Sequence, residues 1–235
     1  MQKELLIFGA NSSLGKGVIK ALAGKDFDKI YLFARNFSGM EIPGNAEKIE
    51  IKDLSIEENV RNCFNLVVPS KEKLFFLFSS IGGFTGGKKV WETGKDDLDR
   101  MLGINLIPGF FLAKYFSLLV SGSAGGSICF TAAFTGKNPE PGKSVYGLSK
   151  AALIHLVETL ALEGKNINLT ANAIAPYIID TPENRKWMEE SDLEKSLKPI
   201  EIGELVYDIF RSFYFITGNI IELTERQKIN GFMQG

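Results

Sequence analysis

The sequence predicts a three-layer α/β fold, in which one doubly wound, mostly parallel sheet lies between two layers of helices. Short apolar segments alternate with longer amphipathic ones along most of the 235 residues, as is typical of parallel strands joined by crossover helices. With 45% hydrophobic residues, a chain of this length can bury one substantial core. We therefore expect a single domain over residues 1–235, with a polar lid at about 177–199.

The N-terminal half supplies the clearest strand and helix patterns. An apolar run at 5–8 predicts the first strand, and the helix after it is expected from about Gly15 to a stop at Gly24. Ser55 and Glu58 have the spacing of a capping box, which predicts that they satisfy two free N–H groups where a helix starts. The other expected elements are strands at 30–34, 48–51 and 74–78 and a helix from Ser55 to about Leu66.

The C-terminal half continues the alternation. A long helical region at about 96–119 contains Pro108, which is expected to kink it. The other expected elements are strands at 127–131, 168–174 and 219–223 and helices at 145–163 and 201–214. In such a sheet, ligands bind in the loops after the carboxyl ends of the strands.

A glycine-rich turn, residues 9–15, follows the first strand. Gly9 allows a close approach to the backbone, and Gly15 lets the next helix pack tightly, so free N–H groups at the helix N-terminus point at one spot. The Gly-Lys-Ser/Thr sequence of nucleoside triphosphatases is absent. The turn therefore predicts a phosphate-binding site of a different kind.

Tyr146 and Lys150 lie four residues apart at the start of a predicted helix, so they share one face. A nearby ammonium favours the phenolate, so Lys150 is expected to lower the pKa of Tyr146 from its reference of about 10. Two such residues also occur by chance at exposed helix starts. Here they follow the loop after the fifth strand, in a chain that also has the glycine-rich turn, which favours a catalytic pair.

Together, these motifs resemble those of the short-chain dehydrogenases/reductases over essentially the whole chain. The family's Thr-Gly-x-x-x-Gly-x-Gly falls on residues 8–15, where Phe8 replaces the threonine and Ser13 the middle glycine. Its Pro-Gly-x-x-x-Thr falls on residues 176–181 and keeps the proline and the threonine. The resemblance implies a Rossmann fold and hydride transfer between a nicotinamide cofactor and a small molecule.

The resemblance also implies the roles of individual residues. Tyr146 would be the acid/base, Lys150 would hold the nicotinamide ribose, and Asn105 would order a proton-relay water. Asp53 would contact the adenine, and Thr181 the nicotinamide carboxamide. The other implied cofactor contacts are Gly9, Asn11, Ser12, Ser13, Leu14, Gly15, Leu54, Ser80, Gly82, Pro176 and Ile179.

The family's catalytic serine falls on Ala133, so no hydroxyl stands in register to polarise a carbonyl oxygen. The sequence does not decide which hydroxyl compensates. The candidates are Thr131, Thr135 and Ser144. Ala133, Phe84 and Tyr177 are expected to line the substrate site.

Within the family, the dihydropteridine reductases also carry alanine at this position and reduce a quinonoid pterin. They resemble this chain in residues 82–87, in residues 180–186 and in a short tail without the usual Asp-Gly-Gly. They typically lack an asparagine at the position of Asn105 and prefer NADH. A dihydropteridine-reductase-like enzyme is therefore the alternative to a reductase of ordinary carbonyl substrates.

A third interpretation comes from another class of protein. Ala133, Ser80 and Tyr177 replace three residues that the family pattern expects. A protein that senses the cofactor without turnover would tolerate these changes. Steady cofactor oxidation with any substrate separates an enzyme from such a sensor.

The end of the second strand predicts which nicotinamide cofactor binds. An acidic residue there binds the ribose hydroxyls and excludes a 2′-phosphate, whereas an arginine accepts it. The acidic position is Ala34 and the next residue is Arg35. We therefore expect NADP to be preferred, with NAD as the alternative.

Composition excludes several other classes of function. The net charge of −1 comes from scattered charges, so no basic stripe predicts binding to nucleic acid or to a membrane surface. Cys63 and Cys129 are expected to be reduced and buried, and with His155 as the only histidine no zinc site can be assembled.

The remaining expectations concern location and assembly. No signal peptide precedes the first strand and no apolar run approaches the length of a membrane span, so we expect a soluble, cytoplasmic protein. The helices at 105–119 and 145–163 are apolar enough to predict a homodimer or homotetramer.

Overall fold

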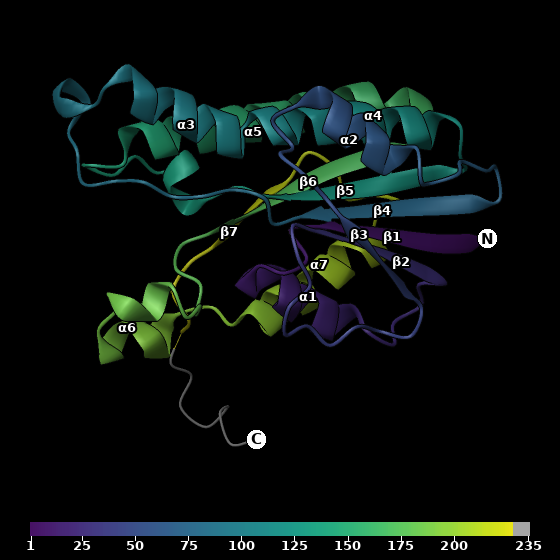
Figure 1. The fold of residues 1–235 in the computed structure, drawn as a ribbon, viewed down its shortest axis with the longest axis horizontal. Helices are drawn as coiled ribbons and strands as arrows, with labels where there is room; N and C mark the ends of the chain where they lie inside the picture. Colours follow the sequence, from purple (N-terminus) through teal and green to yellow (C-terminus); the bar gives the residue numbers. More distant parts are fainter. Residues whose placement is uncertain (228–235) are drawn as a thin grey trace.

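The computed structural model describes residues 1–227, and the expected fold class is confirmed. One seven-stranded sheet with the order β3-β2-β1-β4-β5-β6-β7 lies between two layers of helices, and its neighbouring strands pair in parallel (Figure 1). The strands are β1 (Gln2–Phe8), β2 (Lys29–Ala34), β3 (Ala46–Glu50), β4 (Lys73–Ser79), β5 (Gly125–Thr131), β6 (Leu169–Pro176) and β7 (Ile220–Leu223).

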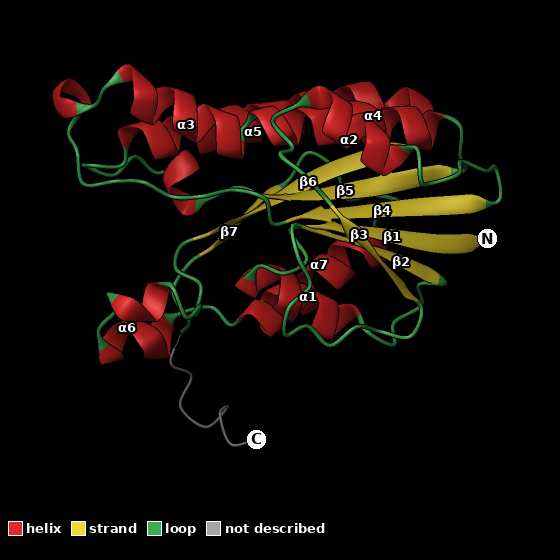
Figure 2. Ribbon diagram, viewed as in Figure 1, coloured by secondary structure: helices red, strands yellow, loops and turns green. Residues whose placement is uncertain are grey.

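The helices divide between the two faces of the sheet (Figure 2). On one face lie α2 (Glu57–Phe64), α3 (Lys95–Asn105), α4 (Ile107–Ser121) and α5 (Ser144–Glu163), and on the other lie α1 (Ser13–Leu22) and α7 (Pro199–Arg211). The short α6 (Glu190–Lys195) lies apart from both layers, within the lid. Each face of the sheet has its own hydrophobic core, because the strands are apolar on both sides.

Helices α1 and α7 approach each other closely because each has a glycine at the contact. A Cβ on Gly17 would lie 2.2 Å from the Pro199 Cβ, and a Cβ on Gly203 would lie 2.5 Å from the Ala21 Cβ. Both distances are shorter than any real contact, so a larger residue at either position would push the helices apart.

The strand order reverses between β1 and β4, and this positions the ligand site. Loops after β1 and β4 leave the sheet in different directions and open a crevice at the carboxyl ends of the strands. The glycine-rich turn follows β1, and the loop that contains Gly82 follows β4.

The predicted capping box is wrong. Helix α2 begins at Glu57, with Ile56 at the N-cap and no side-chain cap hydrogen bond. The Ser55 backbone N–H donates to Asp53 Oδ1 at 2.8 Å, and Glu58 pairs instead with Arg61. The aspartate closes a local turn that competes with helix capping and moves the helix start two residues along.

The long helical region is divided rather than kinked. Helix α3 ends at Asn105 and α4 starts at Ile107, with Pro108 in its first turn. Proline suits this position because its missing N–H is not needed there, whereas inside a helix it removes a hydrogen bond.

Two helical stretches, Lys95–Ser121 and Ser144–Ile167, have the length and composition of a membrane span, with hydropathy 1.5 and 1.3. The expectation that no apolar run approaches this length is therefore wrong. In the most apolar window of each stretch, 44% and 39% of the residues are buried inside the molecule, because one side of each helix packs on the sheet. Core helices have the same composition, and Phe116 and Val157 are fully covered in this way.

Candidate functional site

A cavity of about 670 Å³ opens at the crevice between the loops after β1 and β4. Four of its five wall segments lie at the carboxyl ends of β1 to β4, and the fifth, residues 103–108, comes from α3 and α4. Predicted cofactor contacts supply much of the lining: Gly9, Asn11, Ser12, Arg35, Asp53, Leu54, Ser80 and Gly82. Asn36, Ile51, Lys52, Ile81 and Ile104 also line it.

The glycine-rich turn is held by a serine from the neighbouring strand. The Ser80 hydroxyl lies 2.8 Å from the Ser12 hydroxyl and donates to the carbonyl oxygens of Phe8 and Gly9 at 3.2 and 3.0 Å. A Cβ on Gly9, which has φ +80°, would lie 2.4 Å from Ser80 Oγ. Glycine is therefore required at this position both for its backbone conformation and for space.

Helix α1 starts at this turn with a capped N-terminus. Ser12 is the N-cap, and its hydroxyl accepts a hydrogen bond from the Gly15 N–H at 2.9 Å. Leu14 is buried and anchors the first turn of the helix in the core. The remaining N–H groups at the helix start form the positive end of its dipole.

At the other end of the cavity lie Arg35 and an asparagine pair. Asn11 Nδ2 donates to Asn36 Oδ1 at 2.7 Å, and Asn11 Oδ1 is buried and has no hydrogen-bond partner among the described residues. Arg35 is exposed on the same wall. Asp53 also lines the cavity, and a backbone hydrogen bond from Ser55 holds the pKa of its carboxyl below the ordinary value.

Lys150 lies next to Gly82 of the cavity wall and is almost fully buried. Its Nζ donates to the carbonyl oxygen of Thr131 at 2.8 Å, which directs the ammonium to the end of β5. Burial lowers the pKa of Lys150 to about 8. The hydroxyl of Thr131 is also buried and, within residues 1–227, has no hydrogen-bond partner.

Asn105 connects the loop after β4 to helix α5. Its Oδ1 accepts from the Gly83 N–H at 2.9 Å, and its Nδ2 donates to the Gly83 carbonyl and to Ser149 Oγ, both at 3.0 Å. Ser149 in turn donates to the carbonyl of Tyr146 at 2.8 Å. A Cβ on Gly82 would lie 2.6 Å from Asn105 Oδ1 and 2.9 Å from Lys150 Nζ, so both polar groups meet at that glycine.

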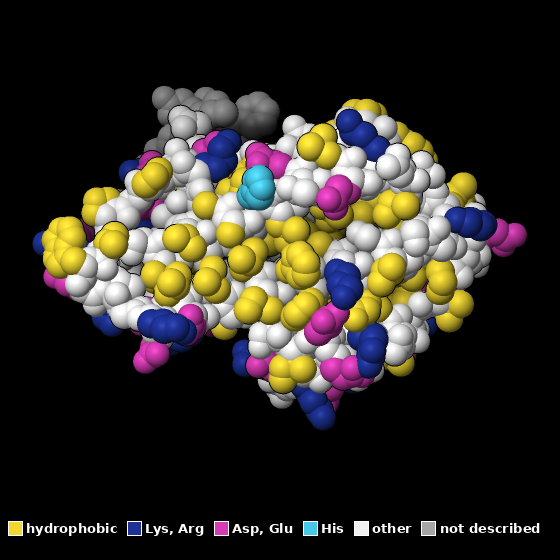
Figure 3. Space-filling view, turned by 90° about the horizontal axis from the view of Figure 1, so that it is seen from above, with side chains coloured by type: hydrophobic (Ala, Val, Ile, Leu, Met, Phe, Trp, Pro, Cys, Tyr) yellow, Lys and Arg dark blue, Asp and Glu magenta, His cyan; other side chains and the backbone are white. Residues whose placement is uncertain are grey.

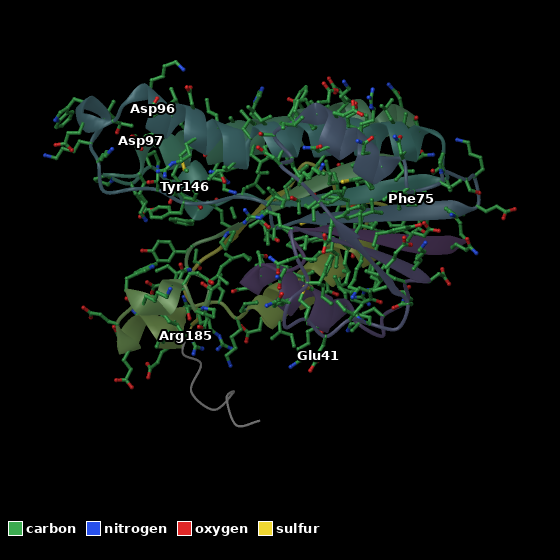
Figure 4. The ribbon with its side chains drawn as sticks, viewed as in Figure 1. Glu41, Phe75, Asp96, Asp97, Tyr146 and Arg185 are labelled. Atoms are coloured by element: carbon green, nitrogen blue, oxygen red, sulfur yellow. The ribbon has the colours of Figure 1, made fainter. Side chains whose placement is uncertain are left out.

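Tyr146 lies near the start of α5, at the end of the molecule that also carries Arg185 and the lid (Figure 4). The ring of Phe84 packs edge-on against it, with centroids 5.0 Å apart and an interplanar angle of 82°. Burial, and to a lesser degree the carboxylate of Glu140, raises the pKa of Tyr146 to about 12. The predicted lowering of this pKa by Lys150 is therefore wrong, because desolvation of the phenolate dominates.

Ala133 is buried at the end of β5, where the family carries its serine. Among the three candidate replacements, Thr135 is also buried, but its hydroxyl pairs with the carboxylate of Glu140. Lys143 donates to the same carboxylate at 2.6 Å. The Thr135 hydroxyl is therefore already hydrogen-bonded within the loop between β5 and α5.

The predicted contacts on the lid lie away from the main cavity. Pro176 ends β6, and the Thr181 hydroxyl accepts from the Asn184 N–H at 3.2 Å. Ile179 pairs with Leu197 across the base of the lid. Tyr177 is 41% exposed and contacts Phe134 edge-on at 5.4 Å, in front of the loop that carries Ala133.

Sequence reasoning missed several residues that shape this site. Asn36, Glu140, Ser149 and Glu183 were not predicted, although Ser149 had a usable signal. It is a small polar residue in an apolar helix, three residues after Tyr146, so it lies on nearly the same face. The other three act through contacts that are distant in sequence or within long loops.

Comparisons with known proteins agree with this geometry. The family model described as short chain dehydrogenase matches residues 3–192. A dihydropteridine reductase from Dictyostelium discoideum is 28% identical over 88% of this chain and 87% of its own length. A carbonyl reductase family member 4 from Xenopus laevis is 27% identical over 94% of this chain and 96% of its own.

Solved structures share the fold. A structure titled "ElxO with NADP Bound" has a TM-score of 0.84 and 24% identity, covering 95% of this chain and 97% of that one. The family model spans most of the chain, and the curated relatives align over nearly their whole lengths. The chain therefore belongs to the short-chain dehydrogenase/reductase family of oxidoreductases.

Proposed function

We propose that this oxidoreductase uses NADP(H) to transfer hydride to or from a small carbonyl or alcohol, with Tyr146 as the acid/base. The observation that carries the proposal is the meeting of buried Lys150 and Asn105 at Gly82, on the wall of a cavity of about 670 Å³. No carboxylate pairs with Lys150 within residues 1–227, and burying such an ammonium is costly, which favours a functional role for it.

The residues present fit a dinucleotide. Gly9 leaves space at the turn that a Cβ would fill, and two buried oxygens, Asn11 Oδ1 and Thr131 Oγ1, have no partner within residues 1–227. A ligand with hydroxyl groups at both ends would satisfy them. The N-terminus of α1 would hold the pyrophosphate, Asp53 and Leu54 the adenine, and Lys150 the nicotinamide ribose.

Arg35 supports NADP over NAD. Its guanidinium is exposed beside Asn36, and Ala34 leaves no carboxylate to repel a 2′-phosphate. The ElxO structure carries NADP, and its fold is shared by this chain.

The chain's own residues would manage the proton. A bound nicotinamide supplies the hydride, and Tyr146 gives a proton to the substrate oxygen from its hydroxyl. Burial raises the pKa of Tyr146 to about 12, so the phenol is protonated at neutral pH and has a proton to donate in the direction of reduction. Asn105 and Ser149 hold the start of α5 and thereby orient Tyr146.

A Tyr146→Phe variant tests this assignment. Turnover is expected to fall by a factor of about 10² to 10⁴, because general acid catalysis is lost. NADPH affinity is expected to stay nearly unchanged. The matched control is Tyr214→Phe, since Tyr214 is 78% exposed after α7. Full activity in Tyr146→Phe would remove the tyrosine from the mechanism, and no turnover with ketones or pterins would favour a cofactor sensor.

A dihydropteridine-reductase-like activity on a quinonoid pterin is the second candidate. Ala133 offers no hydroxyl in register, and the Thr135 hydroxyl is bonded to Glu140, which favours an electron-poor ring that needs less polarisation. The Dictyostelium relative carries the name of that activity. Steady-state assays with ketones and quinonoid pterins, each with NADPH and NADH, separate the two candidates.

We also propose a homo-oligomer that covers the outer face of α3, α4 and α5. Hydrophobic side chains gather on this face (Figure 3). Several are more than half exposed: Phe110, Leu118, Leu148 and Leu162. Apolar patches of this kind commonly mark interfaces. Sedimentation of only a 26.0 kDa particle would contradict the proposal.

A further inference from the structure

One residue of the lid reaches the glycine-rich turn. The Ser13 hydroxyl donates a hydrogen bond to Glu183 Oε2 at 3.2 Å, across 170 positions of sequence. Ser13 stands where the family's pattern has its middle glycine, so this chain has a hydroxyl at a point where the family has no side chain. The contact therefore joins the lid to a hydroxyl that the family's pattern lacks.

The carboxylate of Glu183 also supplies a charge that α1 lacks. Helix α1 has no acidic residue in its first turn and a lysine in its last. A negative charge at a helix N-terminus is favourable because of the helix dipole. Hydrogen bonds from its own backbone N–H and from Ser13 hold the pKa of Glu183 below the ordinary value, so it is ionised at neutral pH.

The lid segment that carries Glu183 is internally braced. Asn184 donates to the carbonyl of Ile179 at 2.9 Å, and the Arg185 N–H donates to the carbonyl of Thr181 at 2.9 Å. Asp180 pairs with the guanidinium of Arg185, at 2.7 Å for the Nη2 contact. These contacts hold the backbone of residues 179–185 in place. A rotation of the Glu183 side chain alone is therefore enough to break its hydrogen bond to Ser13.

We propose that Glu183 is an internal competitor of the cofactor, whose carboxylate lies at the start of α1 where the pyrophosphate of a dinucleotide would bind. The inference rests on the proposed function. Two anions cannot share this spot without repulsion, so binding of a dinucleotide displaces Glu183 from Ser13. Binding of the cofactor therefore releases the lid from the glycine-rich turn.

Affinity measurements on Glu183→Gln test the proposal. Glutamine keeps the hydrogen-bond acceptor and removes only the charge. Isothermal titration is expected to give about two- to fivefold tighter binding of NADPH and of ADP-ribose, which contain a pyrophosphate. Binding of 2′-AMP, which has none, is expected to stay unchanged. The matched control is Glu190→Gln, an exposed carboxylate of α6 in the same lid.

Limited proteolysis gives a second readout that does not depend on activity. Trypsin cleaves after Arg185 and Lys186, both exposed in the lid. Cleavage is expected to be faster in Ser13→Ala than in the wild type without a cofactor, because the hydrogen bond to Glu183 is lost. Saturating ADP-ribose is expected to remove this difference, because the contact is already broken in the wild type.

The outcomes separate the two proposals. If the wild type binds NADPH and Glu183→Gln binds it equally well or more weakly, the competition is overturned and the proposed function stands. The same holds if Ser13→Ala leaves the cleavage rate unchanged. If the wild type binds neither NADPH nor ADP-ribose, the proposed function fails, and this inference fails with it.

Discussion

The two ends of the site are built in different ways. The proposed adenosine end is formed by the loops after β1 to β4. Its residues lie within a few positions of the strand ends, as Gly9, Arg35 and Asp53 do. The substrate end is built from the long loops after β5 and β6, which make their own contacts, such as Thr135 with Glu140. The sheet fixes the geometry of short connections. The geometry of long loops depends on contacts between residues that are not close in sequence, which a local sequence pattern does not predict.

The largest expected effect lies at the substrate end. Ala133→Ser restores a hydroxyl that can donate to a carbonyl oxygen, and one such donor is worth a factor of about 10² to 10³. Ketone reduction is expected to rise by up to about 10²-fold if ordinary ketones are the natural class. The rate constant kcat with a panel of ketones and a quinonoid pterin measures this.

The same variant distinguishes the two candidate activities. Turnover of a quinonoid pterin is expected to change little, because an electron-poor ring needs less polarisation. Ala132→Ser is the matched control, since Ala132 is the buried neighbour of Ala133. An unchanged rate with every substrate would mean that the substrate end is organised differently from the family pattern.

A smaller effect is expected at the adenosine end. Arg35→Ala is expected to weaken NADPH binding by a factor of about ten to a hundred, since a hydrogen bond between charged groups contributes about 1.5 to 3 kcal/mol. NADH affinity is expected to stay the same. Fluorescence titration of both cofactors measures this, with Arg61→Ala in α2 as the control. Equal affinities of the wild type for NADPH and NADH would refute the preference.

The smallest effect concerns stability. The pKa of Lys150 is about 8 in the folded protein against an ordinary 10.5, so the unfolded chain binds more protons between these pH values. Stability is expected to rise with pH across this window, and the full burial penalty, at most about 3 kcal/mol, applies below pH 8. Lys150→Met is expected to be more stable than the wild type at pH 7 and to lose activity.

Urea unfolding at pH 7 and pH 9.5 checks the pH dependence. The stability of Lys150→Met is expected to change less between these pH values than that of the wild type. Lys165→Met, in the turn after α5, is the control because it changes the same charge outside the site. A less stable Lys150→Met at pH 7 would show that the bond to the Thr131 carbonyl outweighs the cost of burial.

The difference between the two ends of the site also explains what could be predicted from the sequence. The doubly wound parallel sheet and the meeting of the loops that carry Gly9 and Gly82 followed from apolar runs and glycine positions, because parallel strands align their carboxyl ends. The capping box failed because Asp53, two residues earlier, offered Ser55 a local turn. Neighbouring polar groups compete for the same N–H, and spacing alone does not rank them.

The errors at the substrate end have a different cause. The pKa of Tyr146 depends on how deeply the phenol is buried and on Glu140, a residue of a loop whose path was not predictable. The spacing of four residues on one helix predicted that Lys150 lies near Tyr146, but not that desolvation of the phenol dominates its pKa. Glu183 was missed for a similar reason, since its partner Ser13 lies at the opposite end of the chain.

The close contact of α1 with α7 has a consequence for folding during synthesis. Helix α1 leaves the ribosome roughly 180 residues before Pro199, which packs against Gly17. At 5 to 20 residues per second this delay is on the order of ten seconds or more. The apolar face of β1 and α1 therefore lacks its partner while most of the chain is made, which makes the nascent N-terminal half a candidate client of chaperones.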